Sequence, residues 1–448
     1  MRFRLWLVIV PLLILLLTPC LSGQSLLVKP PADLEGQLNG VPYHIMVPAN
    51  WNGTLLVYAY GYAEAYGSPL TPMAPATTDR DMLLAKGYAL AGLHAPRAVT
   101  IPGAATDAGF NMKERIQSTA ALTAAFRDMV GQPKRTVVWG KSMGGLVALA
   151  LIEKFPGLFD GAVPLCAPGA GTPRMFDQKL DITLTYAVAF GWKDEWGTPD
   201  NVRPDLNFMT EVVPHITAQL TPEKMWRWEF LRMVNSIPAD ASFYKMPTAP
   251  FLFQTLWLSF VPRPDLNMRA GGRVDQNVGR VYTLRDEDRQ LLKNEFPTIN
   301  SDVLMTQVDS LLAQMNAKTL YASDINARNY AEHYYQPTGR ITRPVLTLHT
   351  THDAAVIPNN EAAYRLMVKQ RGKSELLMQV FTTGIDVKDA LGNPLHVNTH
   401  CTFTPAQYIA GIDAMAQWLK TATRPNSSDF FTEAMGFDPQ YVPDPWPW

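Results

Sequence analysis

The segment RTVVWGKSMGGLVALALIEKF, residues 135–155, restricts the possible folds more than any other part of this chain. It reads as a strand, then the G-x-S-x-G sequence of residues 140–144, then a helix. In such a setting the serine sits on a strained turn with its hydroxyl exposed. Glycines flank it because larger side chains would clash in so sharp a turn. The segment therefore predicts Ser142 as a nucleophile, and an ordinary glycine-rich turn is the alternative.

Strand and helix patterns alternate on both sides of this segment. Apolar runs at residues 53–61, 87–94 and 161–168 predict buried strands, and helical periodicity covers residues 111–132. The alternation stops after Pro168 and resumes with RPVLTLHT, which begins at Arg343. Strands that alternate with helices indicate an α/β domain, a mostly parallel sheet flanked by helices.

Residues 169–340 show no strand–helix alternation and carry large apolar side chains, among them Trp192, Trp196, Trp226, Trp228 and Trp257. We therefore predict a discontinuous catalytic domain, residues 26–168 plus 341–430, with a large, mostly helical insertion after its sixth strand. Loops at the carboxyl ends of parallel strands border the ligand crevice, so the insertion is expected to form a cap or lid over the site. The Pro- and Trp-rich residues 431–448 are expected to form an extended tail.

The amino-terminal sequence MRFRLWLVIVPLLILLLTPCLSGQS predicts a signal peptide of residues 1–23, because basic residues precede an apolar run that ends at small residues. The apolar run is shorter than the roughly 20 residues of a membrane span. Pro19 lies directly before Cys20, which is atypical of lipid-modified cysteines and disfavours a lipoprotein anchor. The mature protein is thus expected to be secreted or periplasmic, without stable membrane insertion.

Charge and motifs exclude several classes of function. The chain has 39 basic and 40 acidic residues, a net charge of −1, and no basic run that would suit nucleic acid. It contains no H-E-x-x-H motif, no paired-cysteine spacing and no G-x-G-x-x-G sequence. We therefore expect neither a metal site nor a cofactor.

A nucleophilic serine needs a base, and the base needs an acid to orient it. After a turn of this kind the chain order is serine, acid, histidine. The segment TLHTTHDAAVIP supplies Asp353 just beyond the strand that re-enters the sheet. We predict Asp353 as the acid, although it could be a simple turn residue. Asp386 and Asp389 follow a later strand and are competitors for the role.

The segment HVNTHCTF contains two candidates for the base, His396 and His400. Residues 404–407, TPAQ, form a capping box with proline at the first helical position, which fixes the start of the last helix just after His400. His396 is expected in a flexible part of the loop. We therefore predict His400 as the base. The remaining histidines are expected to be packing or surface residues, including His94, His349 and His352.

The tetrahedral intermediate of acyl transfer needs an oxyanion hole. One donor is expected to be the backbone N–H of Met143, the residue after the nucleophile. The second is expected from the loop after the strand that ends in YAYGY, and we select the N–H of Tyr62. Removing one such donor typically costs about 2.7–4 kcal/mol of transition-state stabilisation.

Four segments together, PANWNGTLLVYAYGY, GKSMGG, LHTTHDAAVIP and HCTF, resemble the α/β-hydrolase superfamily, specifically its secreted serine esterases, and follow the family order. The resemblance covers the sheet-forming parts and not the insertion. It implies the α/β-hydrolase fold. Many relatives carry a histidine where this chain has Tyr60. The combination of Gly61-Tyr62 in the oxyanion loop with SMGG at the nucleophile is similar to that in cutinase- and polyesterase-type enzymes. This resemblance implies that the ring of Tyr62 helps to hold an aromatic or apolar acyl group.

The usual strand order of this fold puts the serine strand and the base loop about three strands apart. At about 4.8 Å per strand the base loop must reach roughly 14 Å sideways, across the end of the strand GAVPLC. This path brings Cys401 near Cys166 and predicts a disulfide, which suits an even cysteine pair in an oxidising compartment. Two free buried thiols are the alternative.

These expectations together indicate a secreted serine hydrolase that cleaves small-molecule or polymeric carboxylic esters through an acyl-enzyme. The aromatic-rich insertion favours bulky hydrophobic or aromatic esters, although buried aromatic residues are more often simple core. The same triad could act on an amide, a thioester or a diketone C–C bond, because the fold and triad are shared among chemistries. A non-catalytic binding protein on a hydrolase fold is a further alternative.

Overall fold

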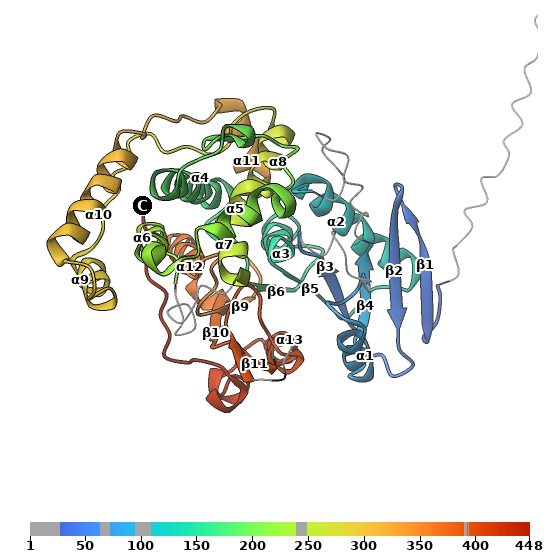
Figure 1. Cartoon of the computed structure of the whole chain (residues 1–448). Helices are drawn as coiled ribbons and strands as arrows, with labels where there is room; N and C mark the ends of the chain where they lie inside the picture. The colour runs from blue at the N-terminus through green and yellow to red at the C-terminus, as the bar shows by residue number, and fades with distance from the viewer. Residues whose placement is uncertain (1–26, 63–71, 95–108, 239–248, 389–391, 393) are drawn as a thin grey trace, which may run out of the picture.

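The computed structural model describes residues 27–62, 72–94, 109–238, 249–388, 392 and 394–448 (Figure 1). The predicted signal peptide, Cys20 and Asp389 lie outside the described residues. Among the described helices, none combines the length and the apolar character that crossing a membrane requires.

One eight-stranded sheet, in the order β1-β2-β4-β3-β5-β6-β9-β10, forms the centre of the molecule. Its strands are β1 Ala32–Leu38, β2 Val41–Val47, β3 Thr54–Ala59, β4 Ala89–Leu93, β5 Arg135–Lys141, β6 Gly161–Leu165, β9 Val345–Thr350 and β10 Leu377–Thr382. Within this sheet only β2 runs against the other strands. The predicted fold class, a mostly parallel sheet flanked by helices, is confirmed.

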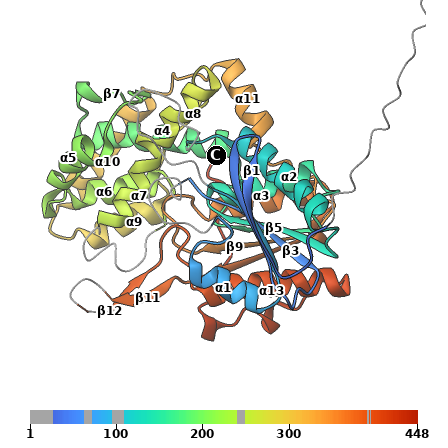
Figure 2. The same cartoon turned by 90° about the vertical axis from the view of Figure 1, so that its right-hand side faces the viewer.

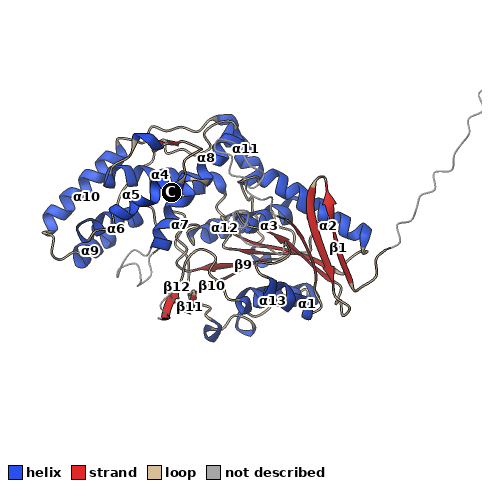
Figure 3. Ribbon diagram, turned by 45° about the vertical axis from the view of Figure 1, so that its right-hand side comes forward, coloured by secondary structure: helices blue, strands red, loops and turns tan. Residues whose placement is uncertain are grey.

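Helices cover both faces of the sheet. Figures 2 and 3 show α1 (Thr77–Ala85) and α13 (Pro405–Thr421) on one face, with α2 (Met112–Met129) and α3 (Met143–Lys154) on the other. On the same face as α3 lies α12 (Asn359–Gln370). The strands β3, β4, β6 and β9 are buried over their whole length. Burial on both faces explains why these strands appear as continuous apolar runs in the sequence.

The two amino-terminal strands, β1 and β2, were not among the predicted strands. In β1, half-buried residues alternate with exposed ones, as expected for a short strand at the edge of a sheet. Leu34 and Leu38 point toward the core, and the residues between them are polar or glycine. Such a pattern is much weaker than the apolar runs of the central strands.

Between β6 and β9 the described chain is mostly helical. It contains α4 Thr172–Phe190, α5 Val213–Ala218, α6 Met225–Val234, α7 Ala249–Phe260, α8 Pro262–Ala270, α9 Asp286–Glu295, α10 Ser301–Asn316 and α11 Ile325–Tyr335, with a small hairpin of β7 Gly197–Thr198 and β8 Asn201–Val202. In Figure 1 most of these helices lie to one side of the sheet, and α9 and α10 lie farthest from β1. Trp196, Trp228 and Phe260 are buried in a second hydrophobic cluster, which this segment forms together with Ala354 and Ile357 from the chain after β9.

A second small hairpin, β11 Ile385–Lys388 and β12 Pro394–Val397, lies between β10 and α13. Shorter helical turns complete the described elements: Asp194–Trp196, Phe208–Val212, Pro222–Lys224, Ser374–Leu376, Ser427–Asp429 and Glu433–Met435. The last residues, 438–448, have no regular secondary structure, and they pass from β10 toward the inserted helices.

Candidate active site

Ser142 lies on the turn between β5 and α3, where the backbone is strained. Its φ of 57° and ψ of −123° are rare for a residue with a side chain. The turn passes very close to the end of β3: a Cβ on Gly144 would lie 2.0 Å from the carbonyl oxygen of Ala59, and one on Gly140 would lie 2.3 Å from it. Only glycine fits at these two positions, which is why the turn carries the G-x-S-x-G sequence.

The structure brings Ser142, His400 and Asp353 together in one chain of hydrogen bonds. The Oγ of Ser142 lies 2.8 Å from Nε2 of His400, and Nδ1 of His400 lies 2.6 Å from Oδ2 of Asp353. The His400 side chain is 18% exposed and Asp353 is fully buried. A base placed between a serine and a buried carboxylate is the arrangement that activates the hydroxyl for attack.

Asp353 is held as a carboxylate by its surroundings. Its Oδ1 accepts hydrogen bonds from the backbone N–H groups of Ala355 (2.9 Å) and Val356 (2.8 Å). Burial acts to raise the pKa of Asp353, but the charge on His400 and hydrogen bonds from His349 and His400 outweigh it and hold the pKa far below its usual value. The acid therefore stays ionised and can stabilise a protonated His400.

Behind Asp353 lies a second histidine whose role the sequence did not reveal. His349 is fully buried, and its Nε2 lies 2.8 Å from the carbonyl oxygen of Val356 and 3.4 Å from Oδ2 of Asp353. Its Nδ1 lies 3.2 Å from Oε1 of Glu361. Since each ring nitrogen faces a carboxylate or carbonyl oxygen, the surroundings favour the imidazolium form of His349. Burial opposes this charge, but hydrogen bonds to Asp353 and Glu361 raise the pKa of His349 to about 10.

Glu361 anchors this second histidine on α12. Its Oε2 accepts hydrogen bonds from Thr347 Oγ1 (2.6 Å) and from Gln379 Nε2 (2.5 Å), which come from β9 and β10. The prediction that His349 is a packing residue is right about its burial. It misses the ionic pairing, because Glu361 and Asp353 meet His349 only once the sheet and α12 have formed.

We expect His349→Gln to lower kcat about tenfold, because the variant removes one charge-assisted hydrogen bond, worth about 1.5 kcal/mol, from the acid. The raised pKa also predicts a pH effect. Stability from the His349 charge is complete below its unfolded pKa of about 6.5 and is lost as pH rises toward 10. Urea unfolding at pH 7 and pH 10 should therefore show a wild-type advantage that shrinks at the higher pH.

The matched control is His396→Gln, which also removes an imidazole, but at an exposed position outside the cavity around Ser142. Equal losses of kcat in the two variants, or a stability difference independent of pH, would contradict the positioning role of His349.

The predicted oxyanion donors lie beside the nucleophile. Both Tyr62 and Met143 border the same cavity as Ser142 and His400. Arg115, from α2, holds the loop that carries Tyr62: its guanidinium donates to the carbonyl oxygens of Tyr60 (2.9 Å) and Gly61 (3.4 Å). The same guanidinium lies 4.0 Å from the centre of the Tyr60 ring.

Many relatives carry a histidine at the position of Tyr60, and the contact with Arg115 explains the tyrosine in this chain. The Tyr60 ring offers its face to the buried guanidinium of Arg115. Arg115 was not among the site residues predicted from the sequence. Within the sequence it is one of several charged residues on a predicted helix, and only its burial in the fold sets it apart.

The structure contains a disulfide between Cys166 and Cys401, with their Cα atoms 5.4 Å apart. β10 lies three positions from β5 in the sheet, and Cys166 directly follows β6, which lies between them. This order agrees with the prediction that the loop carrying His400 crosses the end of β6. The Sγ of Cys401 lies 3.5 Å from Nε2 of His400. Cys166, Cys401 and His400 are close enough together for a metal ion, but the disulfide removes the two thiolates that would bind one.

The start of α13 fixes the other side of His400. Thr404 and Gln407 form the predicted capping box, with each side chain bonded to the other's backbone N–H. The prediction for the loop before it is wrong in one respect: His396 lies in β12 rather than in an irregular loop. There it pairs with Asp386 at 2.8 Å, so neither of these alternatives reaches the triad.

A cavity of about 390 Å³ opens over Ser142. Its walls are mostly apolar and come from the turn, the Tyr62 loop, the inserted helices and the acid and base loops: Gly61, Tyr62, Phe110, Lys141, Ser142, Met143, Pro168, Met175, Trp257, Leu258, Ala355, Val356, His400 and Cys401. A volume of this size suits a small-molecule ligand. Trp257 packs edge-on against Tyr62, with ring centres 5.3 Å apart.

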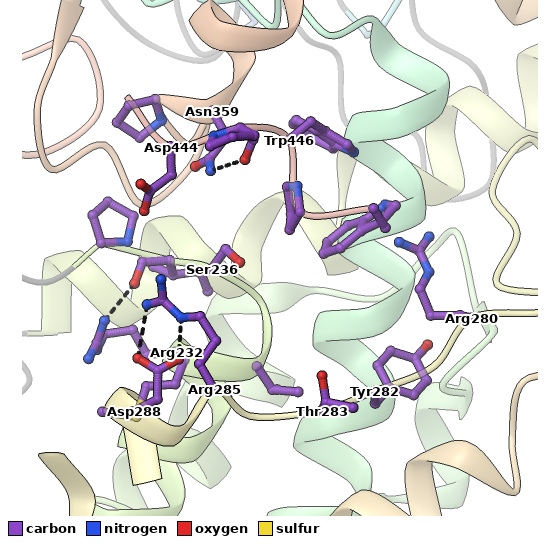
Figure 4. Close-up of a pocket in the computed structure, with 18 of the residues that line it drawn as sticks. Arg232, Ser236, Arg280, Tyr282, Thr283, Arg285, Asp288, Asn359, Asp444 and Trp446 are labelled. Carbon is purple, nitrogen blue, oxygen red and sulfur yellow. Dashed lines mark hydrogen bonds and ion pairs between the residues drawn. The ribbon is translucent and has the colours of Figure 1, made fainter. Parts of the chain in front are cut away.

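A second and larger pocket, of about 490 Å³, lies between the inserted helices and the carboxyl-terminal tail (Figure 4). Its arginines have partners: Arg285 binds Asp288, Arg232 binds Glu229, and Arg280 stacks over the ring of Trp448. The triad does not border it. Size alone would favour this pocket as the active site, but the chemistry lies in the smaller cavity.

The tail residues 441–448 contact both the sheet-forming part of the chain and, through Trp448 against Arg280, the segment between β6 and β9. Asn359 Nδ2 donates to the carbonyl oxygen of Pro445 at 2.8 Å, a bond drawn in Figure 4, and the Tyr441 hydroxyl donates to the carbonyl oxygen of Thr351. The tail is extended and packs on the body.

Comparison with known proteins gives few matches by sequence and many by structure. No protein-family model matches the chain. An o-phthalyl amidase from Xanthobacter agilis is 24% identical over 434 residues, which cover 87% of each chain. This alignment, together with the fold, supports a hydrolase.

Solved structures with a similar arrangement include feruloyl esterase B from Aspergillus oryzae, 13% identical, with a TM-score of 0.38 over 88% of this chain and 80% of that one. An esterase from Pyrococcus furiosus is 12% identical, with a TM-score of 0.37 over 88% and 91% of the two chains. Scores this low carry no argument about function. The strand order with β2 reversed and the strained Ser142 turn between β5 and α3 are those of the α/β-hydrolase fold.

Proposed function

We propose that this protein is a serine hydrolase that cleaves carboxylic esters with a bulky aromatic or apolar acyl group. The observation that carries the proposal is the hydrogen-bond chain from Ser142 through His400 to the buried Asp353. The Ser142 end of this chain borders a largely apolar cavity. A non-catalytic binding protein would have no need for a strained serine aligned with a base and a buried acid.

In the proposed reaction the Oγ of Ser142 attacks the ester carbonyl carbon, and its proton passes to Nε2 of His400. The backbone N–H groups of Tyr62 and Met143 receive the negative charge that forms on the carbonyl oxygen. The intermediate then collapses, the C–O bond to the leaving group breaks, and His400 returns its proton to that oxygen. A water molecule, deprotonated by His400, releases the acid from Ser142 by the reverse route.

The shape of the cavity supports an aromatic acyl group. The rings of Tyr62, Phe110 and Trp257 border the cavity close to Ser142, and the Tyr62 ring lies 6.0 Å from that of Phe110. Aromatic rings favour such tilted and edge-on contacts, which a substrate ring could extend. We also propose that residues 169–340 act as a cap, since Met175, Trp257 and Leu258 from the inserted helices complete the cavity wall.

Cleavage of an amide with the same acyl group is the second candidate, because the relative from Xanthobacter agilis is named an o-phthalyl amidase. The triad serves either bond. Amide cleavage differs in that His400 must protonate a leaving amine, which is a poorer leaving group than an alkoxide or phenoxide. The predicted signal peptide and the disulfide support a further proposal, that the protein acts outside the cytoplasm.

The experiment that separates these candidates is a panel of matched benzoyl substrates, each offered as an aryl ester and as an anilide. We expect ester turnover well above that of a Ser142→Ala control, and anilide turnover at a lower kcat/KM. Higher kcat/KM on the anilide would make the protein an amidase. If neither substrate is turned over faster than by the control variant, the proposal of a hydrolase is wrong.

A further inference from the structure

Lys141 is the one lysine or arginine among the described residues that border the cavity around Ser142. It is the last residue of β5 and directly precedes the nucleophile. It is half-buried, and no aspartate or glutamate is among the described residues that line the cavity with it. Among all described residues, its ammonium group has no ion pair and no hydrogen bond.

Two buried or half-buried arginines of this chain show the contrast with Lys141. Arg263, which is almost fully buried, is bonded to Asp275 at 2.6 Å, and Arg328 is bonded to Asp177 at 2.8 Å. Desolvated charges in proteins are normally paired, because an unpaired charge away from water is costly. Lys141 is only partly exposed, borders a mostly apolar cavity and has no counter-charge among the described residues, so a bound anion would supply one.

The position of Lys141 restricts where that anion can be. Lys141 and Ser142 are neighbours in the chain and border the same cavity, so an anion bound by Lys141 there would share the cavity with the carbonyl that Ser142 attacks. The aromatic residues on the same walls, Tyr62 and Trp257, favour a ring between the two. An ammonium group binds a carboxylate as a point charge, and the low dielectric of an apolar cavity strengthens the attraction.

We propose that Lys141 is a specificity-determining residue that binds a carboxylate carried by the acyl group of the substrate. The preferred substrates are then monoesters or monoamides of aromatic dicarboxylic acids. This inference rests on the proposed function, because it assumes that Ser142 attacks a carbonyl in this cavity.

The test compares two methyl esters of similar shape, monomethyl phthalate and methyl 2-nitrobenzoate. A nitro group has nearly the shape of a carboxylate but no charge. The quantity measured is the ratio of kcat/KM for the charged ester to that for the neutral ester, taken for the wild type, Lys141→Met and Lys141→Arg. Methionine keeps the length of the side chain without the charge, and arginine keeps the charge.

We expect the wild type to favour the charged ester and Lys141→Met to lower the ratio about 10- to 100-fold, the value of one charge-assisted hydrogen bond. The loss should appear mainly in KM for the charged ester, because the carboxylate is bound in both the ground state and the transition state. Lys141→Arg should retain the preference. Raising the salt concentration should lower the wild-type ratio and leave that of Lys141→Met unchanged.

Two results would overturn the inference: a wild type that does not favour the charged ester, or a Lys141→Met variant whose ratio equals that of the wild type. The first of these results is measured on the wild type alone, so the inference can be overturned even if the Lys141→Met variant does not fold. If the proposed function itself is wrong, the result is different: the wild type would hydrolyse neither ester faster than Ser142→Ala does.

Discussion

Replacing Ser142 with alanine is expected to lower kcat by about 10⁵- to 10⁶-fold, the loss seen when the nucleophile of a triad is removed. Without Oγ there is no group to form the acyl-enzyme, and His400, which lies 2.8 Å from that atom, has no proton to accept. Some rate above the uncatalysed reaction should remain if Tyr62 and Met143 are the oxyanion donors that we propose, because their N–H groups could still stabilise an oxyanion formed by attack of water. Initial rates on an aryl ester measure the effect.

The matched control is Ser310→Ala, which removes an exposed hydroxyl from α10, outside the cavity around Ser142. It should retain wild-type activity, and both variants should unfold at the wild-type temperature. An intact oxyanion hole alone leaves a residual activity far below one hundredth of the wild-type kcat. If Ser142→Ala kept more than about a hundredth of that kcat, another group would have to be the nucleophile.

Removing the Cys166–Cys401 disulfide is expected to lower the free energy of unfolding by about 5 kcal/mol. The bond spans 235 residues, and closing a loop of that length strongly restricts the unfolded chain. Activity should fall as well, because the disulfide contacts the imidazole of His400 and fixes the backbone next to it. The variant Cys166→Ala/Cys401→Ala, unfolded in urea without reductant, gives the stability difference, and ester hydrolysis gives the activity.

Reduction of the wild type provides an independent comparison. A thiol reductant should bring the wild type to the stability of the double variant and should leave the double variant unchanged. Both cysteines should also resist thiol-specific reagents in the unreduced, denatured wild type. Two reactive thiols under those conditions, or equal unfolding midpoints for the wild type and the double variant, would contradict the account of the bond.

Local sequence patterns predict the central part of this fold well. The strands β3, β5, β6 and β9 are buried on both faces, so each appears as an apolar run with a sharp end. The Ser142 turn and the capping box of α13 are formed by residues adjacent in the chain, so the sequence alone reveals both. The edge strand β1, which is half-exposed, lacks such a signal.

Groups that support the triad depend on contacts between distant parts of the chain. Glu361 reaches His349 from α12, and Arg115 reaches the carbonyl oxygen of Tyr60 from α2. Neither pair has a spacing that marks it in the sequence, because the sheet brings the partners together. The disulfide is an instructive exception, since the strand order of the fold was enough to place Cys401 near Cys166.

The aromatic residues of the insertion show how composition can mislead. Trp196, Trp226 and Trp228 are buried in the cores of the inserted helices, whereas Trp257 borders the cavity around Ser142. A high aromatic content therefore reports mostly on packing of the insertion. The case for an aromatic substrate depends on Trp257, Tyr62 and Phe110 alone.

The most direct test of the central claim, that His400 activates Ser142 as a nucleophile, is labelling with a fluorophosphonate followed by mass spectrometry of the intact and digested protein. We predict one adduct per chain, located on Ser142, with no adduct on Ser142→Ala and much slower labelling of His400→Gln. An unlabelled wild type, or an adduct at any other residue, would contradict the account.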